Sequence, residues 1–326
     1  MSQYLLLHKI NVQNANAIAG LTYGFPAITN FLGFAHALSR KLPRELGVSL
    51  GGVAIVSHQN LVHARQPKGW GDFVFALTRN PLTHQGNTAP INEEGRLNMT
   101  VSLLIEVDGL IAGDEANTEK LIESITNILP THRLAGGQII DWQDITITPL
   151  AEDSKTLRKL MPGYLLRDRS DYLVQHHAAL KLHDSKACLF DAWCDFAALK
   201  YQAKKLETEQ SEKDESEPNR IKAEWKYVPK PNSGYLVPIG TGFCAISPIY
   251  PAGEVANVRD VSVPVVFAEA AYGIGEWMSV HRIDTIADAI WRYEYQHPWY
   301  VAKSTPFIED EIAPDFADEQ EEMTFN

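Results

Sequence analysis

The chain has 326 residues, of which 45% are hydrophobic, with a formal net charge of −12 and three cysteines. This length and composition suit one large or two ordinary globular domains with a substantial core. The cysteines form no C-x-x-C pair, so neither a disulfide framework nor a zinc site is indicated.

The negative charge is concentrated in two segments. Residues Glu207 to Glu217 carry six acids against Lys213 alone, and the tail from Glu309 onward carries eight acids and no lysine or arginine. Removing these fourteen acids and one lysine from the 41 acidic and 29 basic residues leaves 27 acids and 28 bases. Both segments have compositions typical of disorder, and a neutral body is compatible with a local basic surface that binds phosphate.

An uncharged stretch of 30 residues, from Ile10 to Ser39, lies near the start of the chain. Its Asn, Gln, Gly and Pro residues are not those of a membrane-spanning helix, and the opening MSQYLLLHKINV lacks the pattern of a secretory signal peptide. We therefore expect a cytoplasmic protein that does not bind a membrane. Residues 3–13 predict a central strand, QNANA (13–17) a loop of amide side chains, and Pro26 the start of a helix that reaches Leu42.

The next elements alternate between strands and a helix. Residues 52–64 predict a second strand, and 72–77 and 96–107 resemble the two sides of a hairpin. Between them, Thr78 to Gly95 is rich in Pro, Asn, Thr and Gly and predicts an exposed excursion. An amphipathic helix over 114–130 and a Gly-Gly turn into a last strand complete the order of an α+β, ferredoxin-like or RRM-like fold.

The second half of the chain begins with a helical pattern, with helices over 170–182 and 188–206 and Ser170 as the cap of the first. Strands over 234–250 and 264–277 and a last helix over 283–295 follow. The chain is therefore divided into an RRM-like domain (1–150), a helical subdomain (151–206), an acidic flexible linker (207–222), a β-rich part that completes the fold (223–308) and an acidic disordered tail (309–326).

Motifs for catalysis and metal binding are absent from the sequence. Neither His58 and His63 nor His176 and His177 have the spacing that places two imidazoles on one helical face. There is no G-x-S-x-G, Walker or G-x-G-x-x-G pattern. We therefore predict no metal site, no cofactor and no catalytic residue.

The remaining polar motifs suit RNA. Arginines flank the excursion, RLAGG offers backbone N–H groups beside Arg133, and QNANA offers amides that suit base edges or 2′-hydroxyls. Each motif also has an ordinary reading as a turn, an Asx turn or a solvated loop. The aromatic residues Tyr272 and Trp277 are candidate stacking surfaces, but such residues are more often part of the core. We predict phosphate contacts at Arg79, Arg96, Arg133 and Arg282 and base or sugar contacts at Asn14, Asn16 and His281, with Asn80, Gly136, Gly137 and Arg259 completing the RNA-binding set.

Ten motifs in order carry a resemblance to one family over about residues 5–305: LTYGFP, FLGFAHAL, LTRNP, EEGR, RLAGG, MPGYLL, GYLVPI, SPIY, GEVANVRD and GIGEW with SVHR. The sequence resembles the second Csy protein, the Cas-five-type subunit of the type I-F CRISPR surveillance complex. The resemblance implies an RRM-like domain of the RAMP superfamily with a helical addition and a protruding thumb, which would correspond to residues 78–95.

The function implied by this resemblance is noncatalytic. Such a subunit binds the 5′ handle of the CRISPR RNA, pairs with the large first Csy subunit and adjoins the terminal backbone subunit. The assembled complex finds target DNA through guide pairing, and phage anti-CRISPR proteins are candidate partners. Two alternatives stay open: a scaffold that contacts no RNA, and a metal-free endoribonuclease that processes precursor RNA with His132 or His281 and Tyr23 or Lys68 as acid and base.

Overall fold

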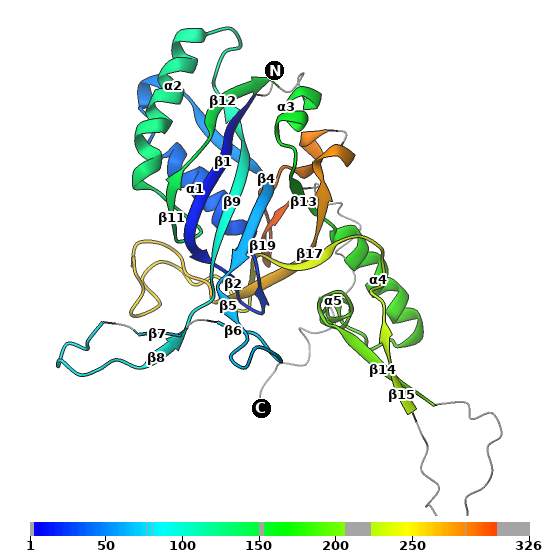
Figure 1. The fold of residues 1–326 in the computed structure, drawn as a ribbon. Helices are drawn as coiled ribbons and strands as arrows, with labels where there is room; N and C mark the ends of the chain where they lie inside the picture. Colours follow the sequence, from blue (N-terminus) through cyan, green and yellow to red (C-terminus); the bar gives the residue numbers. More distant parts are fainter. Residues whose placement is uncertain are drawn as a thin grey trace, which may run out of the picture.

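The computed structural model describes residues 3–75, 77–79, 81–149, 153–205, 223–283 and 285–304. The predicted acidic linker and acidic tail lie outside these ranges. The described residues form a mixed structure in which one curled antiparallel sheet is flanked by helices (Figure 1), in agreement with the expected α+β class. No helix within these ranges is both long and apolar enough to cross a membrane.

The first half of the sheet is built around the 14-residue strand β1 (Gln3–Asn16). On one side β1 pairs with β9 (Arg96–Asp108), and β9 pairs with β4 (Ser49–Val62). On its other side β1 pairs with β11 (Gly137–Asp141) and β12 (Asp144–Pro149). All of these pairings are antiparallel, and helices α1 (Ile28–Ser39) and α2 (Glu115–Ile128) lie in the connections from β1 to β4 and from β9 to β11.

Both faces of this half of the sheet are buried. Side chains alternate between the two faces along each strand, so neighbouring residues of β1 pack in different core clusters. Leu5 and Leu7 lie in the main core with the apolar side of α1, including Phe31. Tyr4 and Leu6 belong to a second core cluster on the opposite face. Strands that are apolar on both sides therefore form the centre of the molecule.

The sheet continues through the second half of the chain. Strand β13 (Tyr164–Asp168) pairs with β4 and leads to β17 (Ala268–Ser279), β16 (Leu236–Ala245), β19 (Trp299–Lys303) and β18 (Arg292–Gln296). The sheet then curls back, since Trp291 forms a β-bridge with Val53 of β4. The Trp291 indole is fully buried and its Nε1 donates to the Leu166 carbonyl at 3.0 Å.

Smaller elements surround the sheet. Helices α3 (Asp153–Lys159), α4 (Ser170–His183) and α5 (Leu189–Ala197) follow the first half, and β14 (Lys200–Lys205) pairs with β15 (Ala223–Val228) in a projecting hairpin (Figure 1). Short pairings and 3-10 turns complete the fold: β2 (Ile18–Ala19), β3 (Thr22–Tyr23), β5 (Ala64–Arg65), β6 (Val74–Phe75), β7 (Leu77–Arg79), β8 (Ile91–Glu93), β10 (Arg133–Leu134), η1 (Arg44–Leu46), η2 (Leu129–Thr131), η4 (Val280–Arg282) and η5 (Ile286–Ala289).

Several expected elements were wrong. The partner of β9 in the hairpin is the long apolar strand β4, whereas β6 pairs with β5. The expected helix over 188–206 ends at Ala197, because pairing with β15 makes the following residues a strand. The expected last helix is the short turn η5 followed by β18, where aromatic residues alternate with polar ones as strands prefer.

Two local expectations need correction. Ser170 is the first residue of α4 and not its cap; its N–H and its hydroxyl both donate to Oδ1 of the buried Asp168, at 2.9 and 2.6 Å. QNANA is not a loop, because β1 extends through Asn16 with a register shift between Val12 and Ala15. A β-bulge lets a strand continue through residues whose composition is typical of loops.

Candidate nucleic-acid interface

The structure brings six of the predicted RNA-binding residues to one end of β1. Asn14 and Asn16 are among the last three residues of that strand. Arg96 lies opposite Asn16 at the start of β9. On the other side, the turn between β10 and β11 reaches the strand, since the Asn16 N–H donates to the Ala135 carbonyl at 2.8 Å. This group, called here the β1 end, consists of Asn14, Asn16, Arg96, Arg133, Gly136 and Gly137.

The two asparagines of the β1 end have different local roles. Asn14 has a φ of 55°, a left-handed conformation that asparagine tolerates, and its N–H donates to Oδ1 of Asn98 at 3.1 Å. Its side chain is exposed. The Asn16 side chain is partly buried and bonds both backbone groups of Ile18, at 2.7 and 3.2 Å. Asn16 therefore stabilises an Asx turn, while Asn14 offers its amide to solvent.

The turn of RLAGG is tightly specified by its backbone. Ala135 and Gly136 have φ values of 50° and 77°, which a two-residue hairpin turn of this kind requires. A Cβ atom on Gly137 would lie 2.7 Å from the Ala15 nitrogen and the Gln13 carbonyl oxygen. Only glycine therefore allows this turn to pack directly against β1, where the exposed Arg133 donates to the Gly136 carbonyl at 3.2 Å.

The arginines near the predicted thumb differ in their surroundings. Arg96 forms an ion pair with Glu94, whose Oε2 lies 2.8 Å from Nη2, and about a third of each side chain is exposed. Arg79 lies in β7 opposite Ile91 of β8, at the base of a hairpin that projects from the body (Figure 1). Asn80 lies outside the described residues.

Exposed rings lie near the base of this hairpin. The side chain of Tyr23 is 76% exposed and packs edge-to-face on Phe75, with ring centres 6.2 Å apart. Trp70 is 72% exposed, and the Lys68 ammonium group lies 5.7 Å from its ring centre. Tyr272 and Trp277 pack against Trp193 and Phe25, in agreement with their expected place in the core. An aromatic residue in a polar, uncharged stretch was the available signal for Tyr23.

Of the other predicted residues, His281 and Arg282 lie apart from the β1 end. Arg259 belongs to the long connection between β16 and β17, and His281 and Arg282 belong to η4. Val280 of η4 packs in the second core cluster with Tyr4, ten residues before Asn14 on β1. At about 3.3 Å per strand residue, this separation is about 30 Å. The predicted set therefore divides into two groups.

Among the described residues, no hydrogen bond joins His132 or His281 to Tyr23 or Lys68, the acid–base candidates for RNA cleavage. His132 is 9% exposed, its ring packs on Phe34 of α1, and burial together with nearby Lys41 lowers its pKa. Its buried Nε2 has no hydrogen-bond partner among the described residues. Tyr23 is an exposed residue of β3 and Lys68 lies on an exposed turn, while His281 bonds the Ser279 hydroxyl at 2.7 Å. In these ranges no cluster of three or more His, Cys, Asp and Glu residues suits a metal ion.

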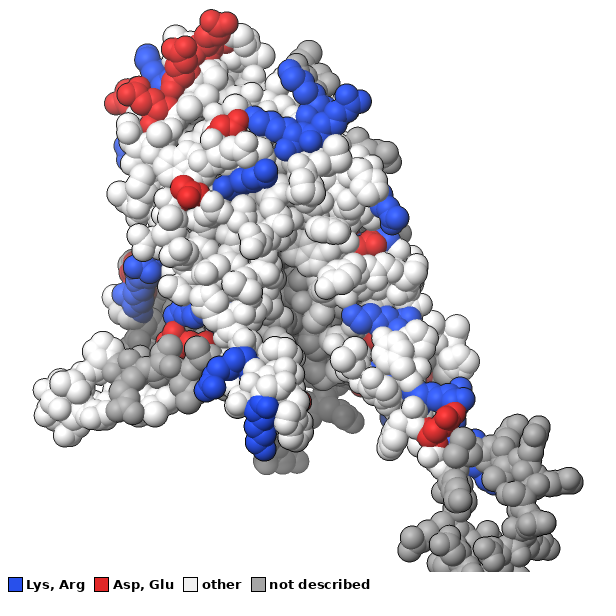
Figure 2. Space-filling view, in the orientation of Figure 1, with Lys and Arg blue, Asp and Glu red and all other residues white. Residues whose placement is uncertain are grey.

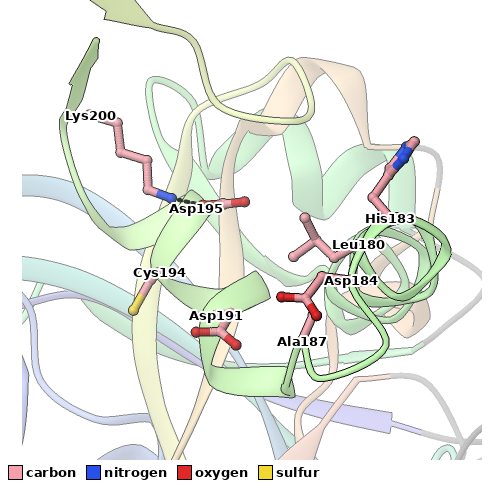
Figure 3. Close-up of a pocket in the computed structure, with 8 residues that line it drawn as sticks. All are labelled: Leu180, His183, Asp184, Ala187, Asp191, Cys194, Asp195 and Lys200. Carbon is pink, nitrogen blue, oxygen red and sulfur yellow. Dashed lines mark hydrogen bonds and ion pairs between the residues drawn. The ribbon is translucent and has the colours of Figure 1, made fainter. Parts of the chain in front are cut away.

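A hollow of about 380 Å³ lies between α4, α5 and the start of β14 (Figure 3). Asp195 bonds His176 at 2.7 Å and also pairs with Lys200, while burial and the Lys200 charge lower the His176 pKa. Asp184 and Asp191 also line the hollow. Three carboxylates in one hollow disfavour phosphate, so we assign these contacts to the packing of the helices.

Comparison with known proteins identifies the family. The model of the family described as "CRISPR-associated protein (Cas_Csy2)" matches residues 5–301. The CRISPR-associated protein Csy2 of Pseudomonas aeruginosa (strain UCBPP-PA14) is 38% identical over 334 aligned positions, which cover 95% of this chain and 97% of that protein. The chain is thus a CRISPR-associated protein. It belongs to the Csy2 family, and the resemblance found in the sequence is confirmed.

Proposed function

We propose that this chain is a noncatalytic subunit of a type I-F CRISPR RNA-guided surveillance complex and that its β1 end binds the 5′ handle of the CRISPR RNA. The observation that carries the proposal is the convergence of QNANA and RLAGG, which are separated by more than 100 residues in the sequence, at one backbone contact. The exposed Asn14 amide, the exposed Arg133, the glycine-rich turn and Arg96, which is paired with Glu94, then lie at the same end of β1. Amides and backbone N–H groups bind bases and phosphates without repelling either.

The strand order supports an RRM-like, RAMP-superfamily assignment for the first half. The order β11/β12, β1, β9, β4, with helices in the two crossovers, is that of ferredoxin-like folds. We propose that residues 1–150 form this domain and that 78–95 form its thumb, with exposed Tyr23 and Trp70 beside the thumb as stacking surfaces for unpaired bases. The helical subdomain (151–206), acidic linker (207–222), β-rich part (223–308) and acidic tail (309–326) complete the proposed division.

The proposed partners follow from membership of the family. We propose that the chain pairs with the large first Csy subunit, adjoins the terminal backbone subunit and encounters target DNA within the assembled complex, in the cytoplasm. Phage anti-CRISPR proteins are further candidate partners. Target specificity would come from guide pairing, as in other RNA-guided systems, so the chain needs to hold the handle rather than read the target.

Binding of a fluorescein-labelled handle RNA to the full chain, followed by anisotropy, tests the proposal. Reversing the charge of Arg133, which is exposed at the β1 end, with Arg133→Glu should weaken binding roughly tenfold or more. The matched control is Lys120→Glu on α2, which makes the same charge change at another exposed position and should leave affinity unchanged. Equal affinities for the parent and Arg133→Glu would overturn the assignment.

Incubation of the same protein with precursor repeat RNA tests the noncatalytic part. Intact RNA is the expected result, because the His132 ring is buried and the His281 ring bonds Ser279, which is not a candidate acid or base. Site-specific cleavage that His132→Ala or His281→Ala abolishes would establish the endoribonuclease alternative instead.

A further inference from the structure

A second group of basic side chains lies far from the β1 end. Lys155, Arg158 and Lys159 of α3 are exposed, and their spacing of three and four residues places them on one side of the helix. Figure 2 shows this group of basic residues over α3, while acidic residues gather over α2. These residues are not in the RNA-binding set predicted from the sequence, although the pattern KTLRK (155–159) was an available signal.

The helix is fixed to the sheet by its other side. Leu157 and Leu160 pack in the second core cluster with Tyr4 and Leu6, on the sheet face opposite α1. Lys159 Nζ lies 2.6 Å from Asp144 Oδ2, and the other oxygen of Asp144 lies 3.0 Å from His8 Nδ1. The basic side chains are therefore carried by a helix that is already positioned, which reduces the entropy lost on binding.

The turn η4 adds a further arginine beside α3. Val280 shares the second core cluster with α3, and its N–H donates to the Gly163 carbonyl at 3.0 Å, just after the helix. Exposed Arg282 follows, and together with Arg167 and Asp288 it lines a small hollow. Arg282 thus lies on a turn beside the helix that carries Lys155 and Arg158, although more than 100 residues separate the two segments in sequence. These three residues are called here the α3 face.

We propose that the α3 face binds the phosphate backbone of a double-stranded nucleic acid, separately from the RNA site at the β1 end. Ammonium and guanidinium groups on a fixed helix suit phosphates, which give affinity without sequence readout. Single-strand binders rely on several stacked rings, whereas the described residues of α3, β13 and η4 include two exposed rings, Tyr164 and His281. A duplex, whose bases are already stacked, needs no such rings.

The affinity is expected to be weak, with a shallow dependence on salt. Asp144 is already paired with Lys159 and His8. Other acids reduce the positive charge of the α3 face, because Asp288 shares the hollow with Arg282. In the sequence, Glu152 and Asp153 precede Lys155, and Asp284 follows Arg282. Few phosphates would be neutralised, so the dependence on salt should be shallow compared with that of a dedicated DNA-binding protein. This proposal does not depend on the RNA site, since the two groups share no residue.

Fluorescence anisotropy of the full chain with labelled duplexes of about 20 base pairs tests the proposal, with a DNA and an RNA duplex in separate arms across a series of KCl concentrations. The Lys155→Glu/Arg158→Glu double variant should weaken duplex binding at least tenfold and reduce the salt slope by about 2. Lys159 is left intact because it pairs with Asp144. Arg133→Glu should bind duplex like the parent, and the double variant should bind handle RNA like the parent.

A Lys155→Gln/Arg158→Gln variant, which only removes charge, guards against misfolding caused by the reversed charges. It should lose duplex affinity in the same direction while its unfolding midpoint stays close to that of the parent. Binding of only the DNA duplex or only the RNA duplex would identify which of the two binds the α3 face. A parent that binds neither duplex, or double variants that bind as the parent does, would overturn the proposal, whatever happens to handle RNA.

Discussion

The β1 end and the α3 face represent two different ways of meeting a nucleic acid. The β1 end is built from backbone, since its exposed amide lies on a left-handed residue and its turn fits only because Gly137 has no side chain. The α3 face is built from charge, with lysine and arginine side chains on a helix whose other side is buried. Donors and acceptors in fixed geometry can discriminate between bases, whereas charge alone attracts any phosphate.

The comparison also shows what each region depends on. The β1 end requires the last residues of β1 to lie beside the first residues of β9 and β11. The α3 face requires two segments that pack on the opposite sheet face. A change in the core should therefore affect both regions, while a change in either region should leave the other intact. The predictions below follow that order.

Truncation of Trp291 should have the largest effect on stability and should affect the β1 end and the α3 face alike. The side chain is fully buried, and its residue links β4 to the end of the curled sheet. Trp291→Ala should lower the free energy of unfolding by about 3–5 kcal/mol, measured by urea denaturation, because it leaves a cavity and an unpaired Leu166 carbonyl. A loss below about 1 kcal/mol would show that this contact does not hold the sheet together.

Substitution of Gly137 should damage the β1 end alone. The added methyl group of Gly137→Ala would lie 2.7 Å from the backbone of β1, so the turn must move away, at a cost of about 1–3 kcal/mol. Handle RNA affinity should fall and duplex affinity should not. Gly33→Ala in α1, where an added Cβ contacts nothing within 4 Å, is the control and should be neutral or slightly stabilising. Unchanged RNA binding in Gly137→Ala would contradict the role of the turn.

A carboxylate at the exposed amide tests the neutrality of the β1 end. Asn14→Asp should weaken handle RNA binding severalfold in anisotropy, because aspartate also tolerates the left-handed conformation but repels phosphate. Asn127→Asp on α2 makes the same chemical change at another exposed position and should have no effect. A similar loss in both variants would indicate a general charge effect and not a local contact.

The smallest expected effect concerns pH and the core behind the β1 end. Burial lowers the pKa of His132 below its usual 6.5, so the unfolded chain binds the proton more tightly. Its contribution to stability is thus present above about pH 6.5 and is lost as the pH falls. Between about pH 7.5 and 5.5 the parent should lose more stability than His132→Leu, as measured by urea denaturation at each pH. Equal losses would show that His132 titrates normally.

The sequence predicted the first half of the fold better than the second. Long apolar strands and the two helices α1 and α2 have clear periodicity, and their order indicated the antiparallel sheet. The pairing of Lys200–Lys205 with Ala223–Val228 and the curl that brings Trp291 to Val53 depend on distant contacts. Local patterns do not contain such contacts, so the sequence predicted helices at both places.

The candidate site was predicted in parts. QNANA and RLAGG were identified as separate polar motifs, but their contact became visible only through the pairing of β1 with β11. Arg282 was grouped with them by residue type, although η4 packs beside α3. Residue type indicates which ligand a side chain suits, whereas only the topology determines which side chains meet the same ligand.

Photo-crosslinking of handle RNA to the full chain, with the crosslinked peptides identified by mass spectrometry, tests the central claim most directly. The account predicts crosslinks within residues 13–17 and 133–138, which Arg133→Glu reduces and Lys155→Glu/Arg158→Glu does not. Crosslinks confined to residues 155–167 and 280–283, with none at the β1 end, would contradict it.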